Sequence, residues 1–145
     1  MRPSEFFALV PELTPDLLGV PEVGLDDNEE AQRIVDALVD TVLLDFELLT
    51  GQREWYAAPT TLTERRAHAV FLCLLTAAAL RNRKVWVAMK AEKVHNPDVQ
   101  QNVAFNLDLL RVIGRAERGT LQRARKLWRG EGTWFEALVT GRAVQ

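Results

Sequence analysis

Residues 69–80 have the sequence Ala69-Val70-Phe71-Leu72-Cys73-Leu74-Leu75-Thr76-Ala77-Ala78-Ala79-Leu80, in which only Thr76 is polar. A helix that is apolar on nearly every side must be packed on several sides, because its surface would otherwise face water. The run is well short of the roughly 20 residues that cross a bilayer. We therefore expect a buried central helix that follows the capping box Thr61–Glu64 and ends near Asn82.

A second long helix is predicted before this one, over residues 28–50. Asp27 and Glu30 form a capping-box signal at its start, and Gly51 is suited to the left-handed position that ends a helix. Its apolar residues recur at spacings of three and four, so it also has a face to bury. Because a short connection joins the two helices, we expect them to pack antiparallel as the core, with Leu74 buried.

The rest of the chain is predicted as shorter elements. Residues 84–94 combine a strand-favouring Val85-Trp86-Val87 with helix-favouring residues, and we assign them to a linker. Further helix starts are expected at Asn96-Pro97-Asp98, at Thr120 and at Thr133 with Glu136, and stops at Gly114 or Gly119, at Gly130 and at Gly141.

The predicted fold class is all-α: a small helical bundle with two long antiparallel core helices and a C-terminal helical arm. We place a helical core at residues 1–95 and a C-terminal helical extension of the same structural unit at residues 96–145. The 145 residues are 48% hydrophobic and 26% charged, as expected for one ordinary globular domain. Cys73 is the single cysteine, and the apolar run before Pro11 is too short for a signal-peptide core, so we expect a soluble cytoplasmic protein.

Charge is divided unevenly along the chain. Residues 1–60 carry 13 acidic and 3 basic residues, whereas residues 61–145 carry 15 basic and 7 acidic residues. An acidic helix beside basic helices within one subunit would explain this division. So would a head-to-tail contact between subunits, in which the acidic face of one meets the basic face of the next. A third interpretation gives the basic half to nucleic acid.

Four acidic residues align on one face of the helix predicted over residues 28–50, because they are separated by seven, four and seven residues. Inward-facing carboxylates at this spacing can hold divalent metals, but the central helix offers no further carboxylate after Glu64 and no Glu-x-x-His motif occurs. We therefore expect no metal and interpret the acidic residues as solvated or facing a neighbouring subunit. They are Glu29, Asp36, Asp40 and Glu47.

Enzyme motifs are missing from the sequence. It contains no Cys-x-x-Cys, no phosphate-binding glycine-rich loop, no Gly-x-Ser-x-Gly and no His-Glu-x-x-His. With His68 and His95 as its two histidines, the chain has few groups for acid-base chemistry near neutral pH. We expect no enzymatic activity, no catalytic residue and no cofactor.

Basic and aromatic residues are combined near the C-terminus, over residues 123–135. Such a mixture can contact phosphates and stack on bases, or dock into an acidic protein groove, while tryptophans at helix junctions often simply pack under loops. The residues concerned are Arg123, Arg125, Lys126, Trp128, Arg129, Trp134 and Phe135.

Several short motifs resemble the small head-tail connector (adaptor, or head-completion) proteins of long-tailed bacteriophages. The acidic helix ends in Leu49-Thr50-Gly51-Gln52-Arg53-Glu54-Trp55, a short connection containing Pro59 follows, and the apolar helix ends in Leu80-Arg81-Asn82-Arg83. The leading segment Phe7-Ala8-Leu9-Val10-Pro11-Glu12-Leu13 is also similar, so the resemblance covers about residues 5–85. Two departures are Gln52, where arginine is common, and the lack of a glycine-containing segment between Lys84 and Asn96.

The resemblance implies a structural protein of the virion neck, assembled in the host cytoplasm. Such proteins form a homo-oligomeric ring, here expected to have 12 subunits. The ring lies beneath the portal protein, carries the tail or a stopper protein, and lets DNA pass through its lumen without sequence-specific binding; no membrane is involved. On this basis we assign the basic and aromatic set above, within residues 120–135, to the portal interface and the four acidic residues to contacts between subunits. The alternatives are a small helical DNA-binding regulator that uses the basic C-terminal third and, more remotely, a metal-dependent enzyme that uses the acidic residues.

Overall fold

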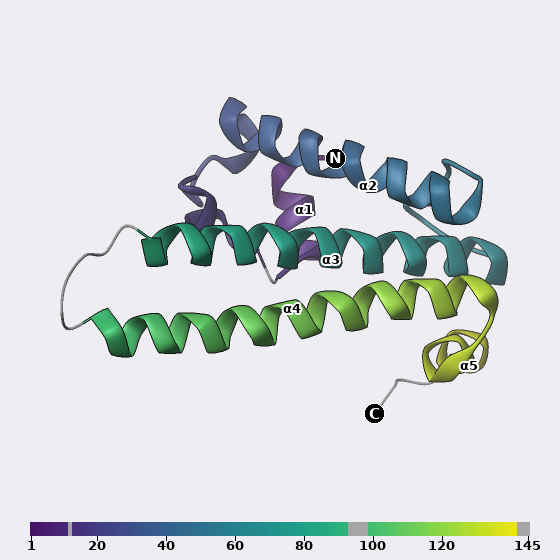
Figure 1. Ribbon diagram of the computed structural model, residues 1–145. Helices are drawn as coiled ribbons and strands as arrows, with labels where there is room; N and C mark the ends of the chain where they lie inside the picture. The colour runs from purple at the N-terminus through teal and green to yellow at the C-terminus, as the bar shows by residue number, and fades with distance from the viewer. Residues whose placement is uncertain (12, 93–98, 142–145) are drawn as a thin grey trace.

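The computed structural model describes residues 1–11, 13–92 and 99–141, and over these ranges it contains helices and loops but no strand (Figure 1). The all-α fold class is therefore confirmed. The elements are α1 (Pro3–Leu9), the 3₁₀ turns η1 (Pro15–Leu18) and η2 (Leu25–Asp27), α2 (Glu29–Thr50), α3 (Leu62–Glu92), α4 (Val99–Arg129) and α5 (Gly132–Thr140).

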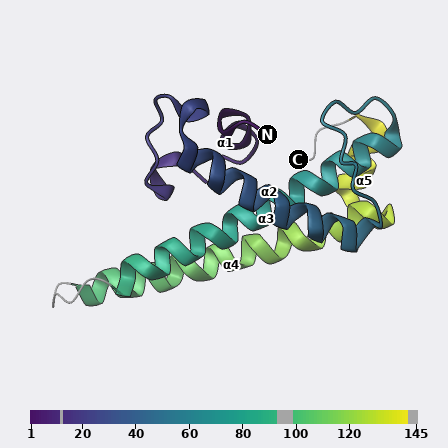
Figure 2. The ribbon, with the colours of Figure 1, turned by 90° about the horizontal axis from the view of Figure 1, so that it is seen from above.

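Helix α3 lies at the centre of the molecule. It runs antiparallel to α4, with which it forms the most extensive helix pair, while α2 crosses α3 on another side and also runs in the opposite direction (Figures 1 and 2). The expected antiparallel packing of α2 and α3 is present, and Leu74 is buried at 7% exposure, as predicted. What the sequence analysis missed is that α4 is the larger partner of α3.

The buried face of α4 explains this pairing. Five residues of α4 are buried, and their spacings of four and three residues place them on one side of the helix. They are Ile113, Glu117, Thr120, Ala124 and Leu127. Ala124 and Leu127 belong to the same hydrophobic core as the residues of α2 and α3. The C-terminal part of α4 is thus part of the core.

Several expected helix limits were wrong. Residues 84–92 are helical and not a linker, because the helix-favouring residues and the long pairing with α4 outweigh the local strand preference. Helix α4 continues through Gly114 and Gly119, since the burial of neighbouring residues such as Ile113 and Thr120 outweighs a cost of about 1 kcal/mol per glycine. Thr120 is not a cap: it lies inside α4, and its hydroxyl donates a 2.8 Å hydrogen bond to the carbonyl of Ala116.

Two other start signals differ from expectation, and one lies outside the described residues. The side chain of Asn28, not Asp27, caps α2 by accepting a hydrogen bond from the amide of Ala31. Helix α5 begins at Gly132, before the capping box expected at Thr133. The expected start at residues 96–98 and the boundary drawn between residues 95 and 96 both fall outside the described residues.

The capping box at the start of α3 is confirmed. The amide of Thr61 donates to the Glu64 carboxylate at 2.8 Å, and the amide of Glu64 donates to the Thr61 hydroxyl at 3.1 Å. Hydrogen bonds from Thr60 and Thr61 lower the pKa of Glu64 from 4.5 to about 2.

The corner between α2 and α3 is held by the motif at residues 49–55. Gly51 takes the left-handed conformation (φ 74°) and its amide donates to the carbonyl of Glu47 at 2.8 Å. Trp55 stacks on Phe71 of α3 with the ring centroids 4.4 Å apart, and on His68 at 5.8 Å. The motif therefore fixes where α3 begins relative to the end of α2.

Candidate functional site

The four predicted acidic residues do align along α2. Glu29, Asp36 and Asp40 are exposed and Glu47 is half-buried. Asp36 accepts a hydrogen bond from Gln32 at 2.8 Å, and Glu47 accepts one from Arg53 at 2.9 Å. We call these four residues the acidic stripe. Within the described part of the chain, no three His, Cys, Asp or Glu side chains come together to hold a metal ion.

Beside the acidic stripe lie two leucines that the sequence analysis did not single out. Leu44 is 61% exposed and Leu48 is 86% exposed, and both lie in the C-terminal half of the long amphipathic helix α2. They are four residues apart, so their side chains are neighbours on one face of α2. Leu48 also borders a surface hollow whose lining includes Leu74 of α3 and Leu121 of α4. Exposed Asp40 and Asp45 flank them. We call Leu44 and Leu48 the leucine pair.

The seven basic and aromatic residues near the C-terminus do not form one surface. Trp128 and Phe135 pack against the hydrophobic core, and the guanidinium of Arg66 from α3 lies 4.6 Å from the centre of the Trp128 ring. These two aromatic residues therefore join α3, α4 and α5 to each other, as junction aromatics often do.

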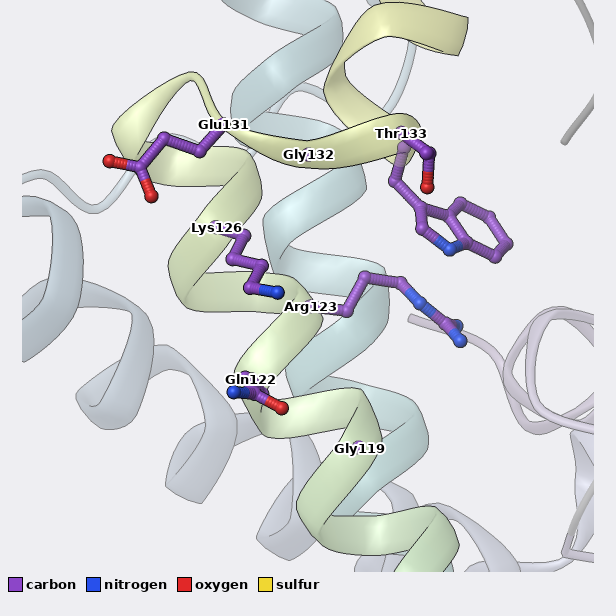
Figure 3. Close-up of a pocket in the computed structure, with 8 residues that line it drawn as sticks. Gly119, Gln122, Arg123, Lys126, Glu131, Gly132 and Thr133 are labelled. Atoms are coloured by element: carbon purple, nitrogen blue, oxygen red, sulfur yellow. The ribbon is translucent and has the colours of Figure 1, made fainter.

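Arg123, Lys126 and Trp134 line a small pocket between α4 and α5 with a volume of about 180 Å³. The Arg123 guanidinium lies 4.0 Å from the centre of the Trp134 ring, a cation–π contact. Figure 3 shows Arg123 and Lys126 rising from α4, with the carboxylate of Glu131 directed away from both. Neither cation forms an ion pair within residues 1–11, 13–92 and 99–141, so the pocket has a positive rim.

The two remaining members, Arg125 and Arg129, belong to a longer row of arginines on α4. Successive positions in this row are separated by three or four residues, which places them on the side of α4 opposite its buried face. All are exposed, and the one ion pair in the row joins Arg111 to Asp108 at 3.7 Å, within the described residues. We call this row the arginine stripe; it consists of Arg111, Arg115, Arg118, Arg125 and Arg129, with Gln122 in the same line.

One carboxylate of α4 is buried. Glu117 is 8% exposed and accepts hydrogen bonds from Arg81 Nε at 2.8 Å and from Lys84 Nζ at 3.1 Å, both on α3. Burial raises the pKa of Glu117, but the hydrogen bonds and charges of Arg81 and Lys84 outweigh burial, so its pKa lies below the usual value. This triad joins the two long helices through the buried face of α4.

An apolar groove lies between the first half of α3 and α5, with a volume of about 840 Å³. Its lining includes Leu72, Cys73, Leu127 and Leu138, and Arg65 is its charged lining residue. Burial raises the pKa of the Cys73 thiol. We call this the α3–α5 groove.

No helix of the described residues combines the length and the apolar character that a membrane span requires. Comparisons with protein-family models, with curated proteins and with solved structures found no match for this chain.

Proposed function

We propose that this protein is a non-enzymatic head-tail connector, which assembles through head-to-tail contacts into a ring beneath a phage portal and joins the capsid to the tail. The resemblance of the Thr50–Trp55 turn to that family supports the proposal, and in this chain the turn sets the corner between α2 and α3. The virion neck is its place of action, and portal, tail or stopper proteins are its partners.

One observation carries the proposal: the acidic stripe and the basic surfaces lie on different sides of α3. Helix α2 covers one side of α3, and α4 with α5 covers another (Figures 1 and 2). A subunit that is acidic on one side and basic on another attracts a neighbour head to tail, while contacts between like sides are repulsive. Repetition of such a contact closes a ring when the rotation per subunit permits.

The portal contact is assigned to exposed basic residues at the C-terminal end of α4. Of the seven residues expected there, Arg125, Lys126 and Arg129 are exposed, whereas Trp128 and Phe135 are occupied in the core. Arginines contribute strongly to protein interfaces, and their charge steers the encounter with an acidic surface.

Measurement of the mass in solution by light scattering, with electron microscopy of the particles, tests ring formation. We expect the variant Asp36→Lys with Asp40→Lys to keep the helical circular dichroism of the wild type and to lose ring formation. The control, Asp16→Lys with Glu22→Lys, changes the net charge equally at exposed acids outside the stripe and should assemble normally. Wild-type assembly of the Asp36–Asp40 variant would contradict the proposed contact.

Portal attachment is tested separately with a recombinant portal ring. Arg125→Glu with Arg129→Glu should abolish co-sedimentation with the ring, while Arg111→Glu with Arg115→Glu, on the same stripe but nearer the other end of α4, should not. Equal loss in both variants would indicate general electrostatic attraction and would refute the assignment to one end of α4.

The arginine stripe favours a second candidate function, a small helical protein that binds duplex DNA through its phosphates. From Arg111 to Arg129 the stripe extends about 27 Å along α4. If all five arginines neutralised phosphates, the logarithm of the binding constant would fall with the logarithm of salt concentration with a slope of about −4 to −5. A monomer with this slope, reduced by about 1 for each Arg→Gln change, would favour the regulator over the connector.

A further inference from the structure

We propose that the leucine pair of one subunit docks into the α3–α5 groove of a second copy of this chain. The inference rests on the proposed head-to-tail assembly and specifies which surfaces meet. It concerns two surfaces to which the proposed function gives no role, the leucine pair and the α3–α5 groove.

The leucine pair has the properties of an interface rather than of an ordinary surface. Single exposed apolar residues are common, but Leu44 and Leu48 are adjacent, are 61% and 86% exposed, and are about 6 Å apart along one helix. A rigid helix that presents two neighbouring leucines matches the way in which amphipathic helices anchor in apolar grooves.

The α3–α5 groove has the complementary properties. Leu72, Leu127 and Leu138 give it an apolar lining, and its volume of about 840 Å³ is ample for two leucine side chains. Among the described residues, the lining combines Arg65 and Thr140 with mainly apolar residues, so this part of the groove does not hold the cluster of convergent polar groups that orients a small polar ligand. Apolar side chains of a protein partner fit this chemistry.

Charge at the edges of the two surfaces selects a second copy as the occupant. Asp40 and Asp45 flank the leucine pair, and neither forms an ion pair or a side-chain hydrogen bond among the described residues. Arg65 lines the groove, and Arg123 lies on Trp134, which forms part of its wall. The acids of one copy would therefore face the arginines of another while the leucines are buried between them.

The contact must form between molecules. Helices α2 and α5 both lie near the first half of α3, but on different sides of it (Figures 1 and 2), and no described residue of α2 lines the α3–α5 groove. Leu48 borders a different hollow, which it shares with Leu74 of α3 and Leu121 of α4. A subunit thus cannot place its own leucine pair in its own groove. Each copy offers one pair and one groove, so the contact can be repeated from subunit to subunit.

The single cysteine of the chain allows a direct test. Leu44→Cys places a second thiol on the leucine pair, and bismaleimidoethane, a short thiol crosslinker, should then join Cys73 of one chain to the new thiol of another. The reaction is run at mildly alkaline pH because the pKa of Cys73 is raised. Peptide mass spectrometry of the dimer band identifies the linked pair. Leu44→Cys with Cys73→Ala removes the groove thiol, and Val112→Cys moves the added thiol to an exposed position on α4; neither should give the link to Cys73.

A second measurement does not depend on crosslinking. Leu44→Asn with Leu48→Asn should weaken self-association at least tenfold with unchanged helical circular dichroism, while Val112→Asn, another exposed apolar residue, should leave it unchanged. If Leu44→Cys assembled with the affinity of the wild type but gave no crosslink between residues 44 and 73, the inference would be overturned. A chain that stays monomeric and unlinked at every concentration reached would also overturn it.

The outcomes separate this inference from the proposed function. If a ring forms without the crosslink between residues 44 and 73, the proposed connector function is retained and the proposed docking site is rejected. A link within a closed two-fold dimer that forms no ring retains the docking site and rejects the connector.

Discussion

Replacing Glu117 by glutamine tests the triad that joins α3 to α4. The change keeps the size and shape of the side chain and removes its charge. Arg81 Nε and Lys84 Nζ, at 2.8 and 3.1 Å in the native protein, then lose their carboxylate partner. Arg81 can still donate to the amide oxygen, whereas the amide NH₂ group cannot accept from Lys84.

The size of the expected loss of stability follows from how exposed Arg81 and Lys84 are. A hydrogen bond between charged groups contributes about 1.5 to 3 kcal/mol when buried, and an exposed ion pair contributes about 0.2 to 1 kcal/mol. The side chain of Glu117 is 10% exposed, but those of Arg81 and Lys84 are 49% and 39% exposed and can return to water. We therefore expect Glu117→Gln to lower the free energy of unfolding by about 1 to 2 kcal/mol near neutral pH.

The sign of the pH dependence provides a sharper test. Because the pKa of Glu117 is lower in the folded protein than in the unfolded chain, its contribution is present above the unfolded pKa and is lost as the pH falls through the folded pKa. The wild type and Glu117→Gln should thus differ at neutral pH and converge in acid, where a protonated Glu117 resembles glutamine.

Urea unfolding followed by circular dichroism, repeated between neutral and acidic pH, measures this difference. The control is Asp108→Asn, which removes an exposed ion pair with Arg111 and should change the stability by less than about 0.5 kcal/mol. A stability difference between wild type and Glu117→Gln that stays constant from neutral to acidic pH would refute the reasoning.

Three further outcomes are expected. Leu74→Ala should lower the free energy of unfolding by about 2 to 5 kcal/mol, because Leu74 is buried in the core, whereas Leu48→Ala at an exposed site should change the stability of the monomer little, as urea unfolding would show. Gly51→Ala should lower the free energy of unfolding by about 1 to 2 kcal/mol in the same assay, because φ at this position is 74° and strains any residue with a Cβ. The added Cβ would meet no atom within 4 Å, so the loss of stability comes from backbone strain alone. Glu64→Gln should reduce the loss of stability on acidification between about pH 5 and pH 2, because the pKa of Glu64 is lowered to about 2 in the folded protein; an unchanged acid profile would show that the capping box does not contribute.

Local signals in the sequence predicted much of the first half of the fold. The capping box at Thr61, the left-handed Gly51 and the apolar run of α3 each depend on neighbouring residues, and all three are present in the structure. The alignment of the acidic stripe also follows from helical spacing alone.

The pairing of α3 with α4 was missed for a physical reason. The buried face of α4 includes Glu117 and Thr120, so its pattern is less apolar than that of α2, and the glycines at 114 and 119 suggested a break. Glu117 can be buried because Arg81 and Lys84 approach it from another helix. This pairing depends on residues more than 30 positions away in the sequence, so local patterns do not reveal it. The arginine stripe could have been found from its spacings of three and four once α4 was taken as continuous.

The lengths of the helices have a mechanical consequence. Helices α3 and α4 each contain 31 residues and extend about 46 Å, whereas α2 contains 22 residues and extends about 33 Å. Figure 2 shows the far end of the α3–α4 hairpin projecting beyond α2, while α5 and the α2–α3 corner lie at the other end. If the latter end is clamped by neighbours, the hairpin becomes a lever arm, and a tilt of about 10° at the clamped end displaces its tip by about 8 Å. Small rotations at one end of the molecule are in this way amplified into movements larger than one helical turn at the other.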